Sequence, residues 1–432
     1  MERWIKMVLN RPWVVLGIVL VITVVAGSLL PRITFDADLH TMIPDDDPVL
    51  MELREVADEF GSQELFFIAL QGENVFSPAT LEKISQLEQQ LEALPGVAEV
   101  QSPFNAQKVE SSFFGIEIRP MAQGLPQTPA EIAQFRDDIL DSPYEGLLVT
   151  ADGRGAALLL ELEAVNSDRS KLVSQIEDIV ESFQGPEEFH IVGDAYVFHY
   201  TEKAMKQDLI NLVPFVVTVI ILVLYLTFRS FLGVVIPLAT VSASVIWTVG
   251  IMTWQGIPVS IISMVMPVIL VTIGIASSIH ILNKYQEALA GGLAKREALV
   301  ETFKTITSPV LMAALTTAAG FGSLITAFVH PIREFGVLTA IGVVLAMGLS
   351  LSLVPALLVL AKEPRVKNAG ETENKGLLTK LLDTFTAWVV NHPRKLSVAV
   401  ILVLIVFAYG ATMLTLESNI VNYFSDSSPI KK

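Results

Sequence analysis

The residue whose type and position most clearly suggest a chemical role lies in one apolar stretch, residues 258–287. The stretch is long enough to cross a hydrocarbon core of about 30 Å, yet it contains the ionisable residue His280. An ionisable group inside a membrane costs several kcal/mol unless it finds a partner or water, so it marks a functional hypothesis. Imidazole groups can exchange protons near neutral pH. We therefore predict that His280 relays protons or couples ion movement. The alternative is a histidine at the membrane interface without such a role.

Hydroxyl groups and small side chains accompany this histidine. The hydroxyls that could carry protons or water between two neighbouring helices are Ser277, Ser278, Thr316 and Thr317. In membrane helices, such residues also serve simply as packing contacts. The small residues that would permit close helix approach are Gly274, Ala276, Gly320 and Gly322.

The sequence lacks the residue patterns of an enzyme or of a metal site. It contains no cysteine, which excludes disulfides, thiolate chemistry and thiolate metal sites. Asp45, Asp46 and Asp47 are consecutive between two prolines, but carboxylates in such a loop are usually just solvated. No nucleophile–base arrangement, phosphate loop or metal-ligand spacing is found. We therefore expect no enzymatic activity, no metal and no cofactor.

Composition places the chain among membrane proteins. Hydrophobic residues make up 52% of it, the mean hydropathy is +0.56, and the apolar residues occur in blocks. The net charge of −16 is unevenly distributed, because residues 32–208 carry 34 acidic side chains and 11 basic ones. This acidic segment argues against nucleic acid as a partner.

The first half of the chain predicts one membrane helix and one soluble domain. Residues 1–31 are expected to form the first transmembrane helix, with a secretory signal as the competing interpretation. Residues 32–208 have the pattern of an α+β domain, in which a strand, a capped helix and a second strand over residues 64–102 are followed by a similar succession over residues 129–193. This succession includes a strand at residues 146–150. Two such units on one antiparallel sheet predict a ferredoxin-like layer.

The second half predicts six more membrane helices. Residues 209–361 form a five-helix transmembrane block, with apolar runs at about residues 209–228, 231–253, 259–282, 309–329 and 335–360. Residues 283–308 are basic and amphipathic, which predicts a helix along the membrane surface. Residues 362–394 are expected to form a linker and an amphipathic helix, and residues 395–415 the seventh transmembrane helix.

The loops rich in lysine and arginine fall on one side of the membrane when seven helices are threaded in order. By the positive-inside rule this side is cytoplasmic. Residues 362–394 would then be cytoplasmic, and residues 32–208 would lie outside the cytoplasm.

A repeat links the two ends of the chain. Asn10-Arg11-Pro12 precedes the first apolar run, and Asn391-His392-Pro393 precedes the last one, at an offset of 381 residues. The match continues without a gap into the acidic stretch that follows each run. We therefore expect residues 416–432 to be the truncated start of a second copy, and the chain to be the first half of a longer protein.

Four segments carry a resemblance to a known family. They are IGIASSIHILNKYQE at residues 273–287, SPVLMAALTTAAGFGSL at 308–324, HPIREFG at 330–336 and LVPALL at 353–358. With the order of helices and soluble domain, the chain resembles the resistance-nodulation-division superfamily of transporters. It is most similar to the branch of the mycobacterial membrane proteins large and the hopanoid exporters, which shares its five-helix block with sterol-sensing domains.

The resemblance implies an α-helical integral membrane protein of about seven transmembrane helices with an extracytoplasmic α+β ferredoxin-like porter domain. It implies a transporter of hydrophobic or lipid-like molecules in a prokaryotic plasma membrane, driven by an ion gradient through alternating access. Many relatives relay protons through an aspartate, often Asp-Tyr, in the fourth helix. Here the matching positions hold Ala276 and Ser277, and the fourth span contains no carboxylate. His280 is the natural substitute.

The resemblance leaves two other functions open. One is a sterol-sensing-like module that binds a lipid without pumping, and the other is a protein-translocation motor of the same superfamily. The expected partners are a lipid or other hydrophobic small molecule, membrane lipids, the missing second half and a further copy in a dimer or trimer.

Overall fold

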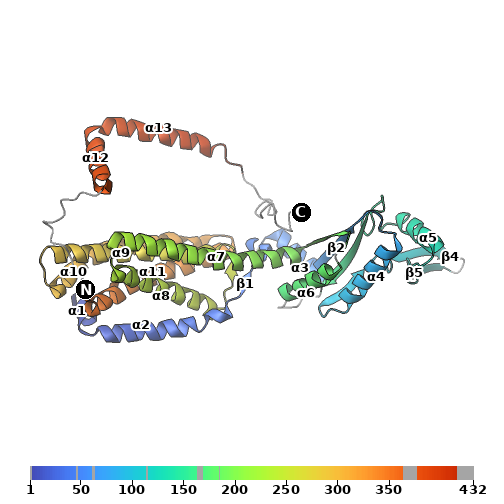
Figure 1. The fold of residues 1–432 in the computed structure, drawn as a ribbon, viewed down its shortest axis with the longest axis horizontal. Helices are drawn as coiled ribbons and strands as arrows, with labels where there is room; N and C mark the ends of the chain where they lie inside the picture. The colour runs from blue at the N-terminus through green and yellow to red at the C-terminus, as the bar shows by residue number, and fades with distance from the viewer. Residues whose placement is uncertain are drawn as a thin grey trace.

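The computed structural model describes residues 2–44, 47–60, 64–112, 115–162, 169–183, 185–362 and 377–415. These residues form a bundle of long helices with an α+β layer beyond one end (Figure 1). Asp45, Asp46 and the predicted second copy at residues 416–432 lie outside the described residues. Asp47 is described, and its carboxylate accepts a hydrogen bond from the Val49 N–H at the start of helix α3 (Pro48–Phe60).

The α+β layer is one four-stranded antiparallel sheet in the order β3-β6-β2-β7. Its elements follow one another along the chain as β2 (Glu64–Gln71), α4 (Pro78–Glu92), β3 (Val97–Gln101), β6 (Gly155–Leu162), α6 (Arg169–Ser182) and β7 (Glu188–Gly193). This succession of strand, helix, two strands, helix and strand is the ferredoxin-like arrangement. The sequence pattern of two strand–helix–strand units is therefore present in the sheet.

Both helices of the layer cover the same face of the sheet. Strand β6 alternates between buried and half-buried residues, with Leu158 and Leu160 fully buried. The buried residues of α4 recur every three or four positions, and those of α6 join the same cluster. Helix α4 begins where Ser77 accepts a hydrogen bond from the Thr80 N–H, followed by a proline in the first turn. The opposite face of the sheet is covered by neither helix.

Two features of this layer differ from the sequence prediction. The strand predicted at residues 146–150 is wrong, because only isolated bridges form there, joining Val149 to Glu145 and Ala156. Gly146 and Gly153 have positive φ angles of 80° and 67°, so the chain turns before a ladder can extend. The insertion between β3 and β6 also contains an unpredicted hairpin, β4 (Gln107–Ser112) and β5 (Gly115–Pro120), followed by the expected helix α5 (Pro129–Leu140).

Seven helices of the described residues are long and apolar enough to cross a membrane, as the sequence predicts. The bundle consists of α1 (Glu2–Asn10), α2 (Pro12–Gly27), α7 (Asp194–Phe228), α8 (Phe231–Trp254), α9 (Met266–Ala290), α10 (Lys295–Gly322) and α11 (His330–Leu360), and the chain continues into α12 (Leu377–Asn391) and α13 (Pro393–Ala411). Helices α8, α9 and α11 form its centre, since 56%, 39% and 50% of their most apolar windows are buried, against 11% or less for the other spans.

Short elements connect the bundle to the layer. Strand β1 (Phe35–Asp36) pairs in parallel with β8 (Val259–Ser260). Single turns of 3-10 helix occur at η1 (Leu30–Arg32), η2 (Leu39–Met42), η3 (Ser263–Val265) and η4 (Ser323–Thr326). Strand β7 passes directly into α7 at Gly193, where an added Cβ would lie 2.9 Å from the carbonyl oxygen of Leu65. The sheet and the membrane bundle are thus joined by one continuous helix.

The predicted surface helix at residues 283–308 is wrong. Helix α9 continues to Ala290, and α10 runs without a break from Lys295 to Gly322. The basic residues therefore occupy the ends of two long helices. The Lys295 ammonium group explains part of this arrangement, because it donates hydrogen bonds to the Val359 and Ala361 carbonyl oxygens at the C-terminal end of α11.

The helix pairs α1–α2 and α12–α13 have the same local geometry. Arg11 has φ −133° and ψ 56°, and His392 has φ −128° and ψ 46°; each precedes a proline that starts the longer helix. Their surroundings differ, since α2 contacts α8 and α11, whereas α12 and α13 stand apart from the other helices (Figure 1). The sequence repeat therefore corresponds to a repeated helix–break–helix unit.

Candidate functional site

A pocket of about 460 Å³ lies between α9 and α10. Its lining residues are Thr272, Ile273, Ala276, Ser277 and His280 from α9, and Ile306, Pro309, Val310, Ala313, Ala314 and Thr317 from α10. Most of this lining is apolar, with four polar side chains. The pocket therefore has the composition typical of a site for a hydrophobic ligand with a few polar groups.

Helical periodicity and small side chains produce this pocket. The five α9 residues recur at intervals of one and three positions, so they share one face of the helix. Ala276 faces Ala313 and Ala314 across the gap, where larger side chains would fill the space. Pro309 lies inside α10 and cannot donate the hydrogen bond that would join it to the carbonyl of Thr305. The pocket thus lies beside an interruption in the hydrogen bonding of α10.

The imidazole ring of His280 is the ionisable group of this pocket. The side chain is exposed, and it makes no hydrogen bond or ion pair within the part of the chain that the structure describes. A neutral imidazole offers one donor and one acceptor, while the charged ring offers two donors. His280 can therefore bind a water molecule or a polar group of a ligand and exchange a proton with it.

The structure brings together only some of the predicted hydroxyl groups. Ser277 and Thr317 line the pocket, and their hydroxyls donate to the carbonyl oxygens of Ile273 at 3.4 Å and Ala313 at 2.8 Å. Each hydroxyl oxygen still has the capacity to accept a hydrogen bond from a ligand or water. These two side chains and His280 form the polar part of the site.

Ser278 and Thr316 lie away from the pocket. Ser278 is fully buried on another face of α9 and donates to the Gly274 carbonyl oxygen at 3.2 Å. Thr316 is exposed and donates to the carbonyl oxygens of Met312 and Ala313. Both hydroxyls are bound to their own helix, and neither lines the site. Thr272, in contrast, lines the site but is absent from the predicted residues. It lies eight positions before His280, which in a helix is close to the same face, so periodicity could have identified it.

The predicted small residues differ in their surroundings. An added Cβ at Gly274 would lie 2.8 Å from a methyl group of Val241 on α8, so the two helices approach closely there. Ala276 lines the pocket. At Gly320, an added Cβ would meet nothing within 4 Å among the described residues, and at Gly322 it would meet only Ala340 at 3.9 Å. The described residues therefore provide no close helix contact at Gly320.

The comparisons with known proteins identify the family. Residues 41–396 match the sequence profile of the MMPL family. The chain belongs to the MMPL family. The predicted resemblance to transporters of this kind is confirmed, and the chain is a multi-pass integral membrane protein.

Relatives of this MMPL chain fall into two length classes. A membrane protein of Methanocaldococcus jannaschii is 26% identical over 386 residues, which cover 84% of this chain and 95% of that protein. The heme uptake protein MmpL11 of Mycobacterium tuberculosis is 21% identical over 70% of this chain, and the sulfolipid-1 exporter MmpL8 of the same species is 20% identical over 93% of it. The chain spans about a third of the length of these two mycobacterial proteins, 33% and 35%.

Proposed function

We propose that this MMPL chain is a transport unit that moves hydrophobic or lipid-like molecules outward from the membrane, driven by an ion gradient. The observation that carries the proposal is the apolar pocket between α9 and α10, into which His280 presents an imidazole that has no hydrogen-bond or ion-pair partner among the described residues. The names of the relatives support the substrate class, since one exports a sulfolipid and another takes up heme.

Protonation of His280 would couple the ion gradient to helix movement. A proton on the ring adds a charge and a second hydrogen-bond donor, which water or an anionic group would have to solvate. The proton-bound form therefore favours an arrangement of α9 and α10 that admits water, and the neutral form favours a closed one. Alternation between two such arrangements is the general basis of secondary transport. Ser277 and Thr317 would bind the water molecules that carry the proton to the ring.

The same proposal assigns a role to the α+β layer. Residues 32–208 would lie outside the cytoplasm and form one wall of the substrate path. Helix α7 supports this role, because it runs from the sheet into the bundle without a break. A movement of the bundle would be transmitted to the sheet through this helix. A second half of the protein, or a further copy of the chain, would complete the path.

The test is transport of a fluorescent phospholipid analogue by the full chain in proteoliposomes, with and without an inward proton gradient. We expect the gradient to accelerate transport in the wild type, and His280→Ala to remove that acceleration with the protein still folded. Thr316→Ala is the matched control on the same pair of helices, because Thr316 lies outside the pocket. Transport that ignores the gradient in the wild type would refute ion coupling. Binding of the analogue without any transport would favour the lipid-binding module.

A further inference from the structure

The uncovered face of the four-stranded sheet has a hollow at its centre. Three residues form one cross-strand row on this face, since Ala69 of β2 is paired with Ala157 of β6 on one side and with His190 of β7 on the other. Two alanines side by side leave the space that larger side chains would fill. The resulting pocket has a volume of about 360 Å³.

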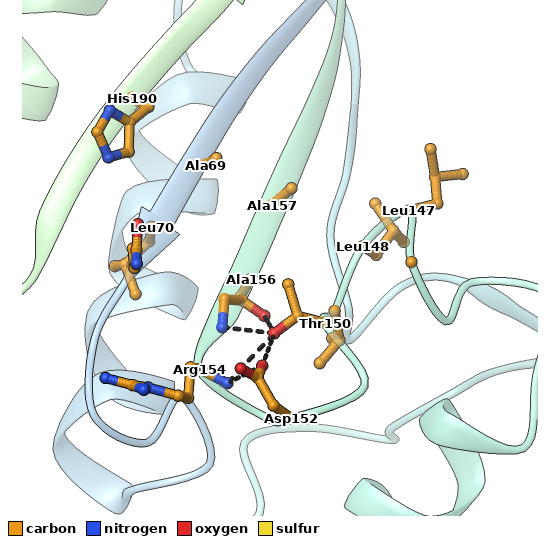
Figure 2. A pocket seen from close by; sticks show the side chains of 14 residues that line it. Ala69, Leu70, Leu147, Leu148, Thr150, Asp152, Arg154, Ala156, Ala157 and His190 are labelled. Carbon is orange, nitrogen blue, oxygen red and sulfur yellow. Dashed lines mark hydrogen bonds between the residues drawn. The ribbon is translucent and has the colours of Figure 1, made fainter. Parts of the chain in front are cut away.

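The two sides of this hollow differ in chemistry. Figure 2 shows Leu147 and Leu148 on one side, and His190 and Arg154 on the other. Both His190 and Arg154 can donate hydrogen bonds to an anion. Within the described residues, neither side chain has a hydrogen-bond or ion-pair partner, although the domain around them is strongly acidic. Two nitrogen-donor side chains therefore meet at one largely apolar hollow, which Asp152 also lines.

The turn that carries Arg154 is held in place by its own hydrogen bonds. The Thr150 hydroxyl donates to Asp152 at 2.6 Å and accepts from the Gly155 N–H at 2.7 Å, while the Arg154 N–H donates to Asp152 at 3.0 Å (Figure 2). The hydrogen bond from the Thr150 hydroxyl, that from the Arg154 N–H and the nearby charge of Arg154 lower the pKa of Asp152 below its usual value. Asp152 is thus engaged by the turn, and the guanidinium group extends away from it in Figure 2.

An apolar strip leads from the hollow toward the membrane. The next cross-strand row consists of Gln101 of β3, Leu159, Phe67 and Val192, and in the row after it Leu65 lies beside Glu161 of β6 and Glu99 of β3. The apolar strip therefore follows β2 and β7, with polar and acidic side chains along its β3 side. Val192 is 61% exposed and Leu65 is 47% exposed. Because β7 passes into α7 directly after Gly193, this end of the sheet is the one that faces the bundle. From Gln71 to Leu65 the face is about 20 Å long at roughly 3.3 Å per residue.

We propose that this face binds a single-chain amphiphile with an anionic headgroup. Arg154 and His190 would hold the headgroup, Ala69 and Ala157 would form the floor beneath it, and the chain would trail along Phe67, Leu159 and Val192 toward the membrane. This site rests on the proposed function and deepens it. It would orient a lipid so that the headgroup leaves the bilayer before the chain. Read away from the membrane, the apolar strip comes first and the hollow with Arg154 and His190 second, and this order decides the orientation.

Photo-crosslinking to the full chain in nanodiscs tests the proposal. Three diazirine probes with the same chain are compared: a fatty acid, a lysophosphatidic acid and the uncharged methyl ester of the fatty acid. We expect the crosslinked peptides of both anionic probes to come from β2, β6 and β7. The crosslinking yield of the fatty acid probe relative to that of the lysophosphatidic acid probe distinguishes a free fatty acid from a phospholipid-derived ligand.

Variants separate the headgroup from the apolar floor. Arg154→Gln should weaken binding of both anionic probes about tenfold, the effect of losing one charge-assisted hydrogen bond, and leave the ester unchanged. Ala69→Leu should fill the hollow and weaken all three probes. Lys171→Gln is the matched control, because Lys171 is exposed on α6, which covers the other face of the sheet. Lys171→Gln should leave the binding of all three probes unchanged.

Equal binding by wild type and Arg154→Gln, or crosslinks confined to the bundle, would overturn the proposal. Crosslinks from this face to a second protein chain would do the same, since they would show that the face is covered by protein. These failures are distinguishable from failure of the transport proposal. The site can be absent while gradient-driven transport and its dependence on His280 persist.

Discussion

At the scale of single residues, contacts rather than residue types decide the roles of the predicted positions. His280, Ser277 and Thr317 line one pocket, whereas Ser278 and Thr316 satisfy their hydroxyls within their own helices. Equally small residues likewise have different surroundings. The exchange of a glycine for alanine therefore has a different expected cost at each position.

Gly274→Ala and Gly320→Ala form a matched pair. The new methyl group at position 274 would lie 2.8 Å from Val241, and such overpacking typically costs about 1–3 kcal/mol. At position 320 it would meet nothing within 4 Å among the described residues, and alanine is favoured over glycine in a helix by about 1 kcal/mol. We expect thermal unfolding in detergent at a lower temperature for Gly274→Ala and not for Gly320→Ala. Val241→Ala should restore the stability of Gly274→Ala, and failure to do so would contradict the assigned contact.

Two glutamates of the soluble layer should respond to pH in opposite directions. The hydrogen bond from Lys83 is the main reason that the pKa of Glu187 is lowered, so this carboxylate stabilises the fold at neutral pH. Its contribution is present above the unfolded pKa of about 4.3 and is lost as the pH falls through the lowered folded value. Glu187→Gln should cost about 1 kcal/mol at pH 7, and the cost should shrink below about pH 4.

Glu88 provides the contrast. Burial raises its pKa, so the ionised side chain is disfavoured in the fold as the pH rises through the folded value. Glu88→Gln should therefore stabilise the protein at pH 7, with the gain vanishing at low pH, where the carboxyl is protonated in both states. Thermal unfolding of the full chain at both pH values measures these differences. Effects of the same sign for Glu88→Gln and Glu187→Gln would contradict the assigned causes.

At the scale of elements, two long helices each join regions of the chain that the sequence pattern predicts to be separate. Helix α10 extends as one helix from its basic end to the pocket, so residues 295–308, predicted for the membrane surface, belong to the same helix as Thr317. Helix α7 joins the sheet to the bundle in the same way. The end of α10 is anchored to α11 through Lys295.

Lys295→Met tests this anchor. The substitution keeps the length of the side chain but removes the hydrogen bonds to the carbonyl oxygens of Val359 and Ala361. We expect about 1 kcal/mol of destabilisation and faster hydrogen exchange at the C-terminal turn of α11. Lys284→Met is the control, because its ion pair with the exposed Glu287 is worth little. Unchanged exchange at α11 in Lys295→Met would show that the anchor is not needed there.

At the scale of the whole molecule, one membrane helix stands apart from the other membrane helices of the described residues. None of the most apolar window of α13 is buried, although its local geometry repeats that of α2, which contacts α8 and α11. A helix with this apolar composition can contact lipid or another set of helices. Within this chain, α2 already occupies the place beside α8 and α11. By analogy, α13 would pack against the corresponding helices of a second unit.

We therefore expect the purified chain to associate with further copies. Native mass spectrometry after release from detergent should detect dimers or trimers, since α13 and the outer face of α10 are apolar and largely uncovered. Polar substitutions on α13, such as Leu404→Ser, should shift the distribution toward monomers. A monodisperse monomer of the wild type at all detergent concentrations would refute this expectation.

The sequence by itself determined the membrane class, the seven spans, the strand–helix–strand units and the family, because apolar length, periodicity and local motifs are properties of contiguous residues. Only the tertiary structure decided that Ser278 and Thr316 face away from the pocket, that no described residue packs closely against Gly320, and that Ala69, Ala157 and His190 form one row. These outcomes depend on the rotation of each helix and the register of each strand. Both are set by packing between residues that are far apart in the chain.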